Sequence, residues 1–107
     1  NNSIQRLCKE SKVSAFQVFK MLVHLDVKTA ELTRLHKMCF SSLTHLQILS
    51  LTELQIEKIS EIAFNGLLHV EILNISNNII THLEDNLFAL RKSLKVLDIT
   101  KNSLYLI

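Results

Sequence analysis

Apolar residues recur along this chain with a period of 24 residues, and this pattern carries most of the information in the sequence. From Leu22 onward, apolar side chains fill a fixed series of slots, in the order Leu22, Leu25, Val27, Ala30, Leu32, Leu35, Phe40 and Leu43. The next two repeats fill these slots with Leu46, Leu49, Leu51, Leu54, Ile56, Ile59, Phe64 and Leu67, then with Val70, Leu73, Ile75, Asn78, Ile80, Leu83 and Phe88. A last series runs from Leu94 to Ile107. A period of this length is the signature of a solenoid of stacked units.

Each repeat contains one short apolar–polar alternation, which predicts a strand. Leu25 and Val27 point inward on the first such strand, and their counterparts are Leu49, Leu51, Leu73, Ile75, Leu97 and Ile99. Stacking of the repeats places these strands side by side in a parallel sheet, with neighbours about 4.8 Å apart. The longer half of each repeat returns on the opposite, wider side. We therefore expect an α/β solenoid that curves as an arc, with a short-stranded parallel sheet on its concave face and an irregular or short-helical convex side.

Two further slots predict how the interior is built. Phenylalanines at Phe16, Phe40, Phe64 and Phe88 share one slot and should stack as an internal spine. A second slot holds Asn2, Ala30, Leu54, Asn78 and Asn102. An asparagine there hydrogen-bonds to the backbone of adjacent turns, which Ala30 and Leu54 cannot do. We expect irregular turns at these two repeats, unless simple repacking absorbs the change.

The chain reads as one segment, residues 1–107, with about four turns of the solenoid. Both ends fall in the middle of a repeat, so we expect the array to continue in both directions. The first turn is longer than the others by four residues, which lie within residues 8–15. Because terminal repeats need polar caps, the Leu7 side and the Leu104–Ile107 side should expose core unless further repeats, or something else, cover these faces.

Composition narrows the function classes. The single glycine and the absence of proline argue against phosphate loops, and no Lys/Arg cluster accompanies the net charge of +2 to suggest nucleic-acid binding. No apolar run approaches the roughly 18 residues of a membrane span. No nucleophile–base arrangement or metal constellation stands out, so we expect neither an enzyme nor a cofactor.

The pattern LxxLxLxxNxLxxLxxxxFxxL resembles the typical class of leucine-rich repeat, and the match covers nearly the whole chain. That class is common in Toll-like receptors, repeat-bearing G-protein-coupled receptors and matrix proteoglycans. The lengthened loop and the irregular asparagine slots look most like a Toll-like receptor ectodomain. The resemblance implies a ligand-recognition segment on the extracellular or luminal face of a signalling receptor of innate immunity, at the cell surface or in endosomes.

The partners that the resemblance implies are a protein or other macromolecular ligand, the neighbouring repeats of the array and a second receptor in a dimer. Three alternatives stay open: the repeat domain of a G-protein-coupled receptor, a secreted matrix or adhesion protein, and an intracellular adaptor. Fold alone does not name the ligand.

Outward strand positions form three columns that are candidates for ligand binding. The first is mainly apolar and β-branched: His24, Ile48, Ile72 and Val96. The second is Asp26, Ser50, Asn74 and Asp98, and the third is Lys28, Thr52, Ser76 and Thr100. Exposed apolar patches mark partner contacts, although β-branched residues also simply suit strands.

Cysteines and sequons bear on the compartment. Cys8 and Cys39 fall on convex loops of adjacent repeats, where a disulfide is geometrically feasible, and the alternative is two unpaired thiols. Asn1 and Asn74 each begin an Asn-x-Ser sequon. A glycan on Asn74 would obstruct the concave face and move ligand binding to the lateral edge or the convex loop.

His45 and His69 share one slot just before successive strands, so we expect the two imidazoles to be neighbours. Their mutual repulsion when protonated would give a switch at endosomal pH. The alternative is two exposed histidines without coupling.

Overall fold

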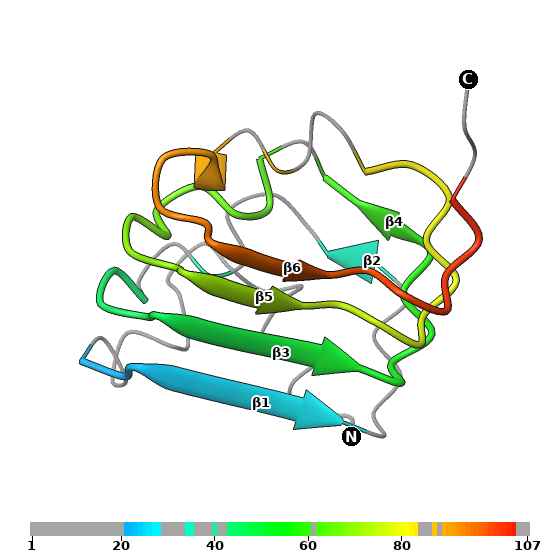
Figure 1. Ribbon diagram of the computed structural model, residues 1–107, viewed down its shortest axis with the longest axis horizontal. Helices are drawn as coiled ribbons and strands as arrows, with labels where there is room; N and C mark the ends of the chain where they lie inside the picture. Colours follow the sequence, from blue (N-terminus) through cyan, green and yellow to red (C-terminus); the bar gives the residue numbers. More distant parts are fainter. Residues whose placement is uncertain are drawn as a thin grey trace.

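The computed structural model describes residues 21–28, 34–35, 40, 43–60, 62–83, 87 and 89–104. These residues contain β1 (His24–Lys28), β2 (Arg34–Leu35), β3 (Ile48–Thr52), β4 (Lys58–Ile59), β5 (Ile72–Asn74) and β6 (Val96–Asp98). Among these residues, turns and bends lie between several of the strands, and short pieces of 3₁₀ helix occur around residue 90 (Figure 1).

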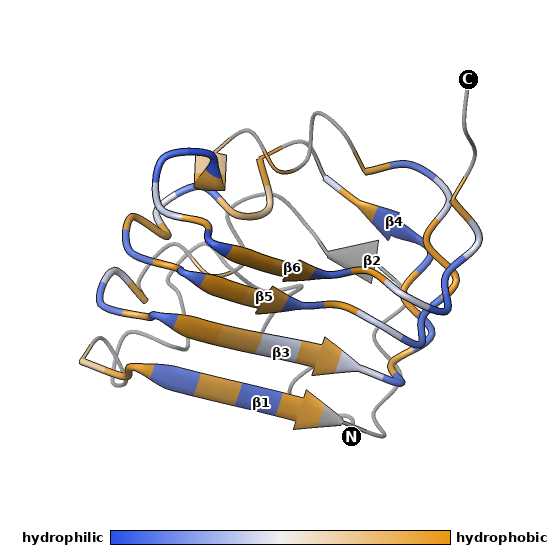
Figure 2. Ribbon diagram, in the orientation of Figure 1, coloured by the Kyte–Doolittle hydropathy of each residue, from blue (hydrophilic) through white to orange (hydrophobic). Residues whose placement is uncertain are grey.

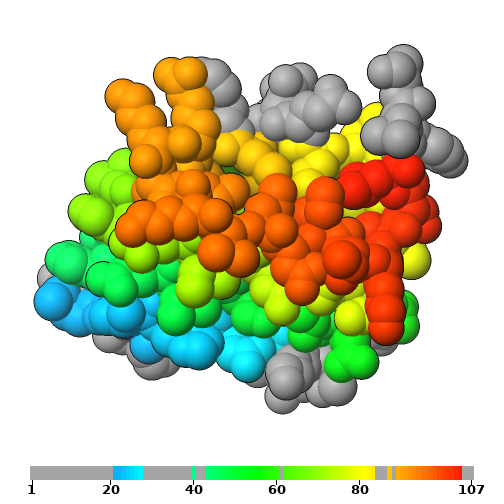
Figure 3. All heavy atoms as spheres, viewed as in Figure 1, coloured from blue at the N-terminus to red at the C-terminus, as the bar shows by residue number. Residues whose placement is uncertain are grey.

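The main sheet is parallel and has the strand order β1-β3-β5-β6 (Figure 1). Its register pairs each residue with its counterpart in the next repeat, so that Leu25 lies beside Leu49, and Leu49 beside Leu73. This register confirms the sheet that the sequence predicts. Figure 3 shows the outcome in space, with the repeats stacked as successive layers from β1 to the segment after β6.

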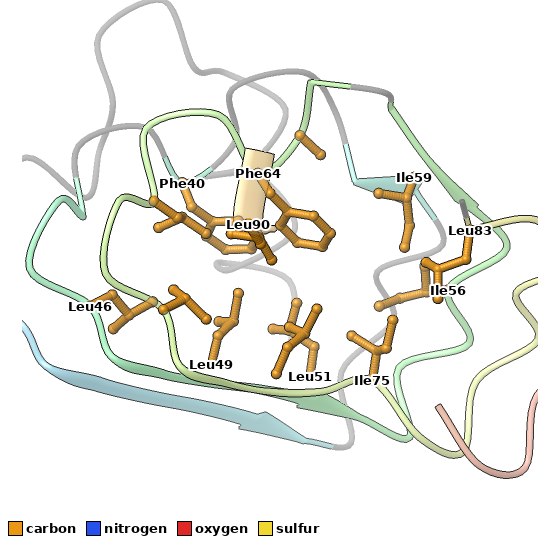
Figure 4. Packing of buried hydrophobic residues seen from close by; sticks show 14 of the residues in the cluster. Phe40, Leu46, Leu49, Leu51, Ile56, Ile59, Phe64, Ile75, Leu83 and Leu90 are labelled. Carbon is orange, nitrogen blue, oxygen red and sulfur yellow. The ribbon is translucent and has the colours of Figure 1, made fainter. Parts of the chain in front are cut away.

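A second, two-stranded parallel sheet pairs β2 with β4, on the return side of the repeats and across the core from the main sheet (Figure 4). It places Arg34 beside Lys58 and Leu35 beside Ile59. The sequence predicts an irregular or short-helical return side, and these short strands are an addition to that prediction. They form because stacked repeats bring equivalent backbone segments side by side on both halves of the turn.

The core lies between the two sheets. Four of the predicted inward positions are fully buried, which confirms them: Leu49 and Leu51 on β3, Leu73 on β5 and Ile75 just after it. Figure 4 shows Leu49, Leu51 and Ile75 pointing into the core. Along β1, polar and apolar residues alternate in the same way (Figure 2). Leu97 was expected to point inward but is 37% exposed. It lies on β6, which has a sheet neighbour on one side only among the described strands.

Phe40 and Phe64 form the described part of the phenylalanine spine. Both are buried, and their rings stack with centroids 6.4 Å apart and an interplanar angle of 11°. Stacking of aromatic rings adds to the large apolar area that each ring removes from water. The pair confirms the predicted contact between consecutive repeats, while Phe16 and Phe88 lie outside the described residues.

Asn78 satisfies the backbone of the preceding repeat. Its Oδ1 accepts hydrogen bonds from the amides of Leu54 (3.0 Å) and Ile56 (3.1 Å). Its Nδ2 donates to the carbonyl oxygens of Leu51 (2.8 Å) and Ile75 (3.0 Å). Asn102 repeats this arrangement one turn later, accepting from Ile80 N–H at 3.0 Å. The two described asparagines of this slot, Asn78 and Asn102, therefore make the predicted hydrogen bonds to the backbone of adjacent turns.

The turn at Leu54 is irregular, as the sequence predicts. Three repeats share a left-handed residue at one slot, namely Glu53 (φ 59°), Asn77 (φ 58°) and Lys101 (φ 56°). The Leu54 turn adds a second one at Gln55 (φ 60°), whereas the described counterparts Ile79 and Ser103 are not left-handed. Left-handed backbone costs roughly 1–2 kcal/mol for a residue with a Cβ. The Leu54 side chain is buried in the core instead of bonding the backbone. Ala30 lies outside the described residues.

Candidate functional site

The candidate site is the solvent-facing side of the main sheet, here called the outer face. Its central feature is the apolar row, formed by Ile48, Ile72 and Val96, with His24 at the β1 end. Ile72 is 36% exposed and Val96 is 51% exposed. The register places these side chains side by side across four strands, so the structure brings together the column predicted from sequence.

A polar row lies next to it, formed by Asp26, Ser50, Asn74 and Asp98. Two of its members fold back on their own chain. Asn74 Oδ1 accepts the Ser76 amide at 3.0 Å. Asp98 Oδ1 accepts both the Thr100 amide (3.0 Å) and the Thr100 hydroxyl (2.7 Å). These bonds hold short polar side chains close to the sheet, which leaves the taller apolar row accessible beside them.

The Thr100 hydroxyl and amide lower the pKa of the Asp98 carboxyl below its usual value, because hydrogen bonds to the ionised form favour it. Asp98 is half-buried, and this partial burial opposes the lowering of its pKa without cancelling it. Asp98 is therefore a fixed negative charge at the edge of the outer face at neutral pH.

The third predicted column is only partly on the outer face. Lys28 lies beside Thr52 in the register, and Thr100 is exposed. Ser76 was expected to face outward but is only 5% exposed. The alternation ends with β5 at Asn74, and the following chain is held between neighbouring repeats, as the bond from Asn77 N–H to the Thr100 carbonyl (3.0 Å) shows.

A rim that the sequence prediction missed runs along the start of the strands, through Val23, Gln47, Glu71 and Lys95. Val23 is exposed, and Lys95 Nζ lies 3.7 Å from Glu71 Oε1, with both side chains largely in solvent. An exposed pair of this kind contributes little to stability. The 24-residue slots of the sequence would have found this rim.

The two predicted histidines lie on adjoining turns. His69 Nδ1 is 3.0 Å from the carbonyl oxygen of Thr44, so the ring donates there when Nδ1 carries the proton. His45 Nδ1 is 3.4 Å from the hydroxyl of the same Thr44. Both imidazoles are exposed. The structure thus joins the two slots through Thr44, while the coupled titration stays a prediction.

Among the predicted modification sites, Asn74 is described. Its side chain is half-buried, and Oδ1 is held by Ser76, which leaves Nδ2, the atom that carries an N-linked glycan, as the unheld end of the amide. Asn1, Cys8 and Cys39 lie outside the described residues.

Within the described ranges, no group of three or more His, Cys, Asp or Glu is arranged to hold a metal ion. In the same residues, no helix has the length and hydrophobicity needed to cross a bilayer.

Comparison with known proteins gives one match. A family model described as "Leucine rich repeat" matches residues 44–104, which is more than half of the chain and includes β3, β5 and β6. Comparisons with curated proteins and with solved structures found no match.

Proposed function

The chain belongs to the leucine-rich-repeat family, and from this premise we propose that it recognises a protein partner through the outer face of its main sheet. Repeats of this family are typically protein-binding modules without enzymatic activity. The observation that carries the proposal is the apolar row, because β-branched side chains on three adjacent strands, β3, β5 and β6, expose hydrocarbon where a solvated sheet face is usually polar.

The shape of the outer face supports a protein partner. The side chains of the polar row are short, and those of Asn74 and Asp98 accept hydrogen bonds from residues two positions further along the chain. A partner that reaches the apolar row therefore does not have to displace long charged side chains. Apolar centres with polar rims are the usual anatomy of protein interfaces. Here the rim includes Glu71 and Lys95.

We further propose that the chain is part of a receptor ectodomain of the Toll-like type, on an extracellular or luminal membrane face. The resemblance of the repeat and the sequon at Asn74 support this assignment. In a longer array of such repeats, the wider return side would curve the solenoid and make the outer face concave. The partners that we propose for the chain are a second receptor in a dimer and a soluble ligand.

Occupancy of Asn74 decides which part of the surface is used. Asn74 lies between Ser50 and Asp98 in the register. A glycan there would cover the middle of the outer face and direct the partner to the lateral edge.

Site-specific photo-cross-linking in cells that make the full protein tests the proposal. A photo-reactive phenylalanine derivative is placed at Ile72, at Val96, or at Leu68, which is a matched control because it is apolar and 66% exposed but lies in none of the strands. We expect the same adduct from Ile72 and Val96 and none from Leu68. Adducts from Leu68 alone, or from no position, would contradict the proposal.

A further inference from the structure

The turn at residues 62–66 contains the dipeptide Asn65–Gly66, which includes the only glycine of the chain. Asn65 N–H donates to the Ile62 carbonyl at 3.2 Å, and Leu67 N–H donates to the Phe64 carbonyl at 3.2 Å. Gly66 has a φ of 96°, in the left-handed region where glycine carries no Cβ penalty. The turn is thus fixed on both sides of the dipeptide.

The two groups at its centre are unrestrained. In the described part of the chain, neither the carboxamide of Asn65 nor the backbone amide of Gly66 has a hydrogen-bond partner. Both residues are half-buried, so water reaches them. With no side chain on Gly66, nothing shields its nitrogen from the Asn65 carboxamide.

We propose that Asn65–Gly66 is a site of spontaneous covalent modification in the folded protein, with water as its co-reactant. The Gly66 nitrogen attacks Asn65 Cγ and forms a new C–N bond. The bond from Cγ to Nδ2 breaks, and ammonia leaves with the proton that the Gly66 nitrogen gives up. Water then opens the resulting succinimide at either carbonyl, which yields aspartate or isoaspartate. No oxidant or reductant takes part.

The other described asparagines are restrained to different degrees. The Asn78 side chain takes part in five hydrogen bonds and that of Asn102 in four. The Asn74 carboxamide is held by the Ser76 amide. The Asn77 carboxamide donates one long bond to the Ser76 hydroxyl (3.5 Å) and precedes Asn78, whose side chain would hinder attack by its nitrogen. Asn102 is the most useful comparison, because it precedes a small residue, Ser103; it differs from Asn65 in the bonds that hold its side chain and in the side chain that the following residue carries. The structure therefore predicts that Asn65 reacts first.

The product changes the core. Phe64 and Leu67, on either side of the dipeptide, are 0% and 1% exposed. Isoaspartate adds one carbon to the main chain between them, and either product adds a negative charge. Because Phe64 stacks on Phe40 of the preceding repeat, the isoaspartyl form should loosen the contact between these repeats. This inference does not depend on the proposed function.

Incubation of the folded protein at mildly alkaline pH, followed by peptide mapping, tests the site. We expect the Asn65 peptide to gain the mass that marks exchange of an amide for a carboxylate and to split into two isomers, severalfold faster than any change at Asn102. In urea, Asn102 should react as well. Asn65→Gln is the control, because it keeps a carboxamide that no bond constrains but closes the ring reluctantly.

Two results would overturn the inference. The first is an intact Asn65 in the folded protein together with modification in urea, which would show that the turn protects it. The second is equal rates at Asn65 and Asn102 in the folded state, which would show that the hydrogen bonds do not select the site.

Discussion

At the scale of single residues, the residue in the asparagine slot decides how many buried backbone amides and carbonyls of each turn find a hydrogen-bond partner. The Asn78 side chain hydrogen-bonds to buried backbone amides and carbonyls of two repeats. The Leu54 turn lacks its own asparagine, yet Asn78 accepts from its Ile56 amide just as Asn102 accepts from the Ile80 amide one repeat later. The Leu54 turn also differs from these repeats by a second left-handed residue, Gln55.

Replacement of Asn78 by alanine tests this role. Asn78→Ala leaves the buried amides of Leu54 and Ile56 without a partner, which should lower the free energy of unfolding by on the order of 3 kcal/mol. Denaturant titration measures it. Asn65→Ala is the control, since the Asn65 side chain makes no hydrogen bond in the described structure. Equal losses in the two variants would show that the ladder does not matter.

Asp98 predicts a pH dependence at the same scale. Its pKa is lowered by the hydroxyl and amide of Thr100, so these bonds stabilise the fold above the unfolded-state pKa and weaken as the pH falls through the lowered one. We expect an NMR titration to show the Thr100 amide signal shifting together with the Asp98 carboxyl. Asp98→Asn keeps an Oδ1 acceptor, like the one that Asn74 offers to the Ser76 amide, but removes the titrating carboxyl. In this variant the pH-dependent shift of the Thr100 amide signal should vanish. A Thr100 signal that titrates in both proteins would refute the assignment.

At the scale of elements, the 24-residue spacing was enough to predict the strands of the main sheet, their parallel order and their register. The spacing works because each repeat must place its apolar slots above those of the last. It could not show that β2 and β4 pair, because two-residue strands have no readable alternation. It also placed Ser76 on the surface, since the pattern does not reveal where β5 ends.

A short sequence pattern marks the side chains that bond their own backbone on the outer face. Asn74 and Ser76, like Asp98 and Thr100, are an Asx residue and a hydroxyl residue two positions apart, a spacing at which an Asx side chain bonds its own backbone. This signal would have shown that the polar row is self-bonded.

Paired cysteines test the register directly. Ser50 lies beside Asn74 on neighbouring parallel strands, where Cα atoms are about 4.8 Å apart, within the range that a disulfide spans. Ser50→Cys with Asn74→Cys should therefore cross-link on mild oxidation, detectable by mass. Asp26→Cys with Asn74→Cys is the control, because β3 lies between these strands. A cross-link in the control, and not in the test pair, would mean a different strand order.

At the scale of the whole molecule, the solenoid separates stability from recognition. Inner side chains such as Leu49 and Leu73 are buried and hold the repeats together, while their neighbours Ile48 and Ile72 are available on the outer face. A partner can therefore be accommodated by changes on the outer face that leave the core intact. The family follows from the repeat, whereas the ligand depends on surface residues that the repeat leaves unconstrained.

The most direct test of the account is the affinity of the partner captured at the apolar row, measured by calorimetry on the wild type, Ile72→Lys and Leu68→Lys. A buried lysine charge in an apolar contact should weaken binding by about tenfold or more for Ile72→Lys. Leu68→Lys should bind as the wild type does. Unchanged affinity in Ile72→Lys with a loss in Leu68→Lys would contradict the account and place the binding surface around Leu68, away from the apolar row.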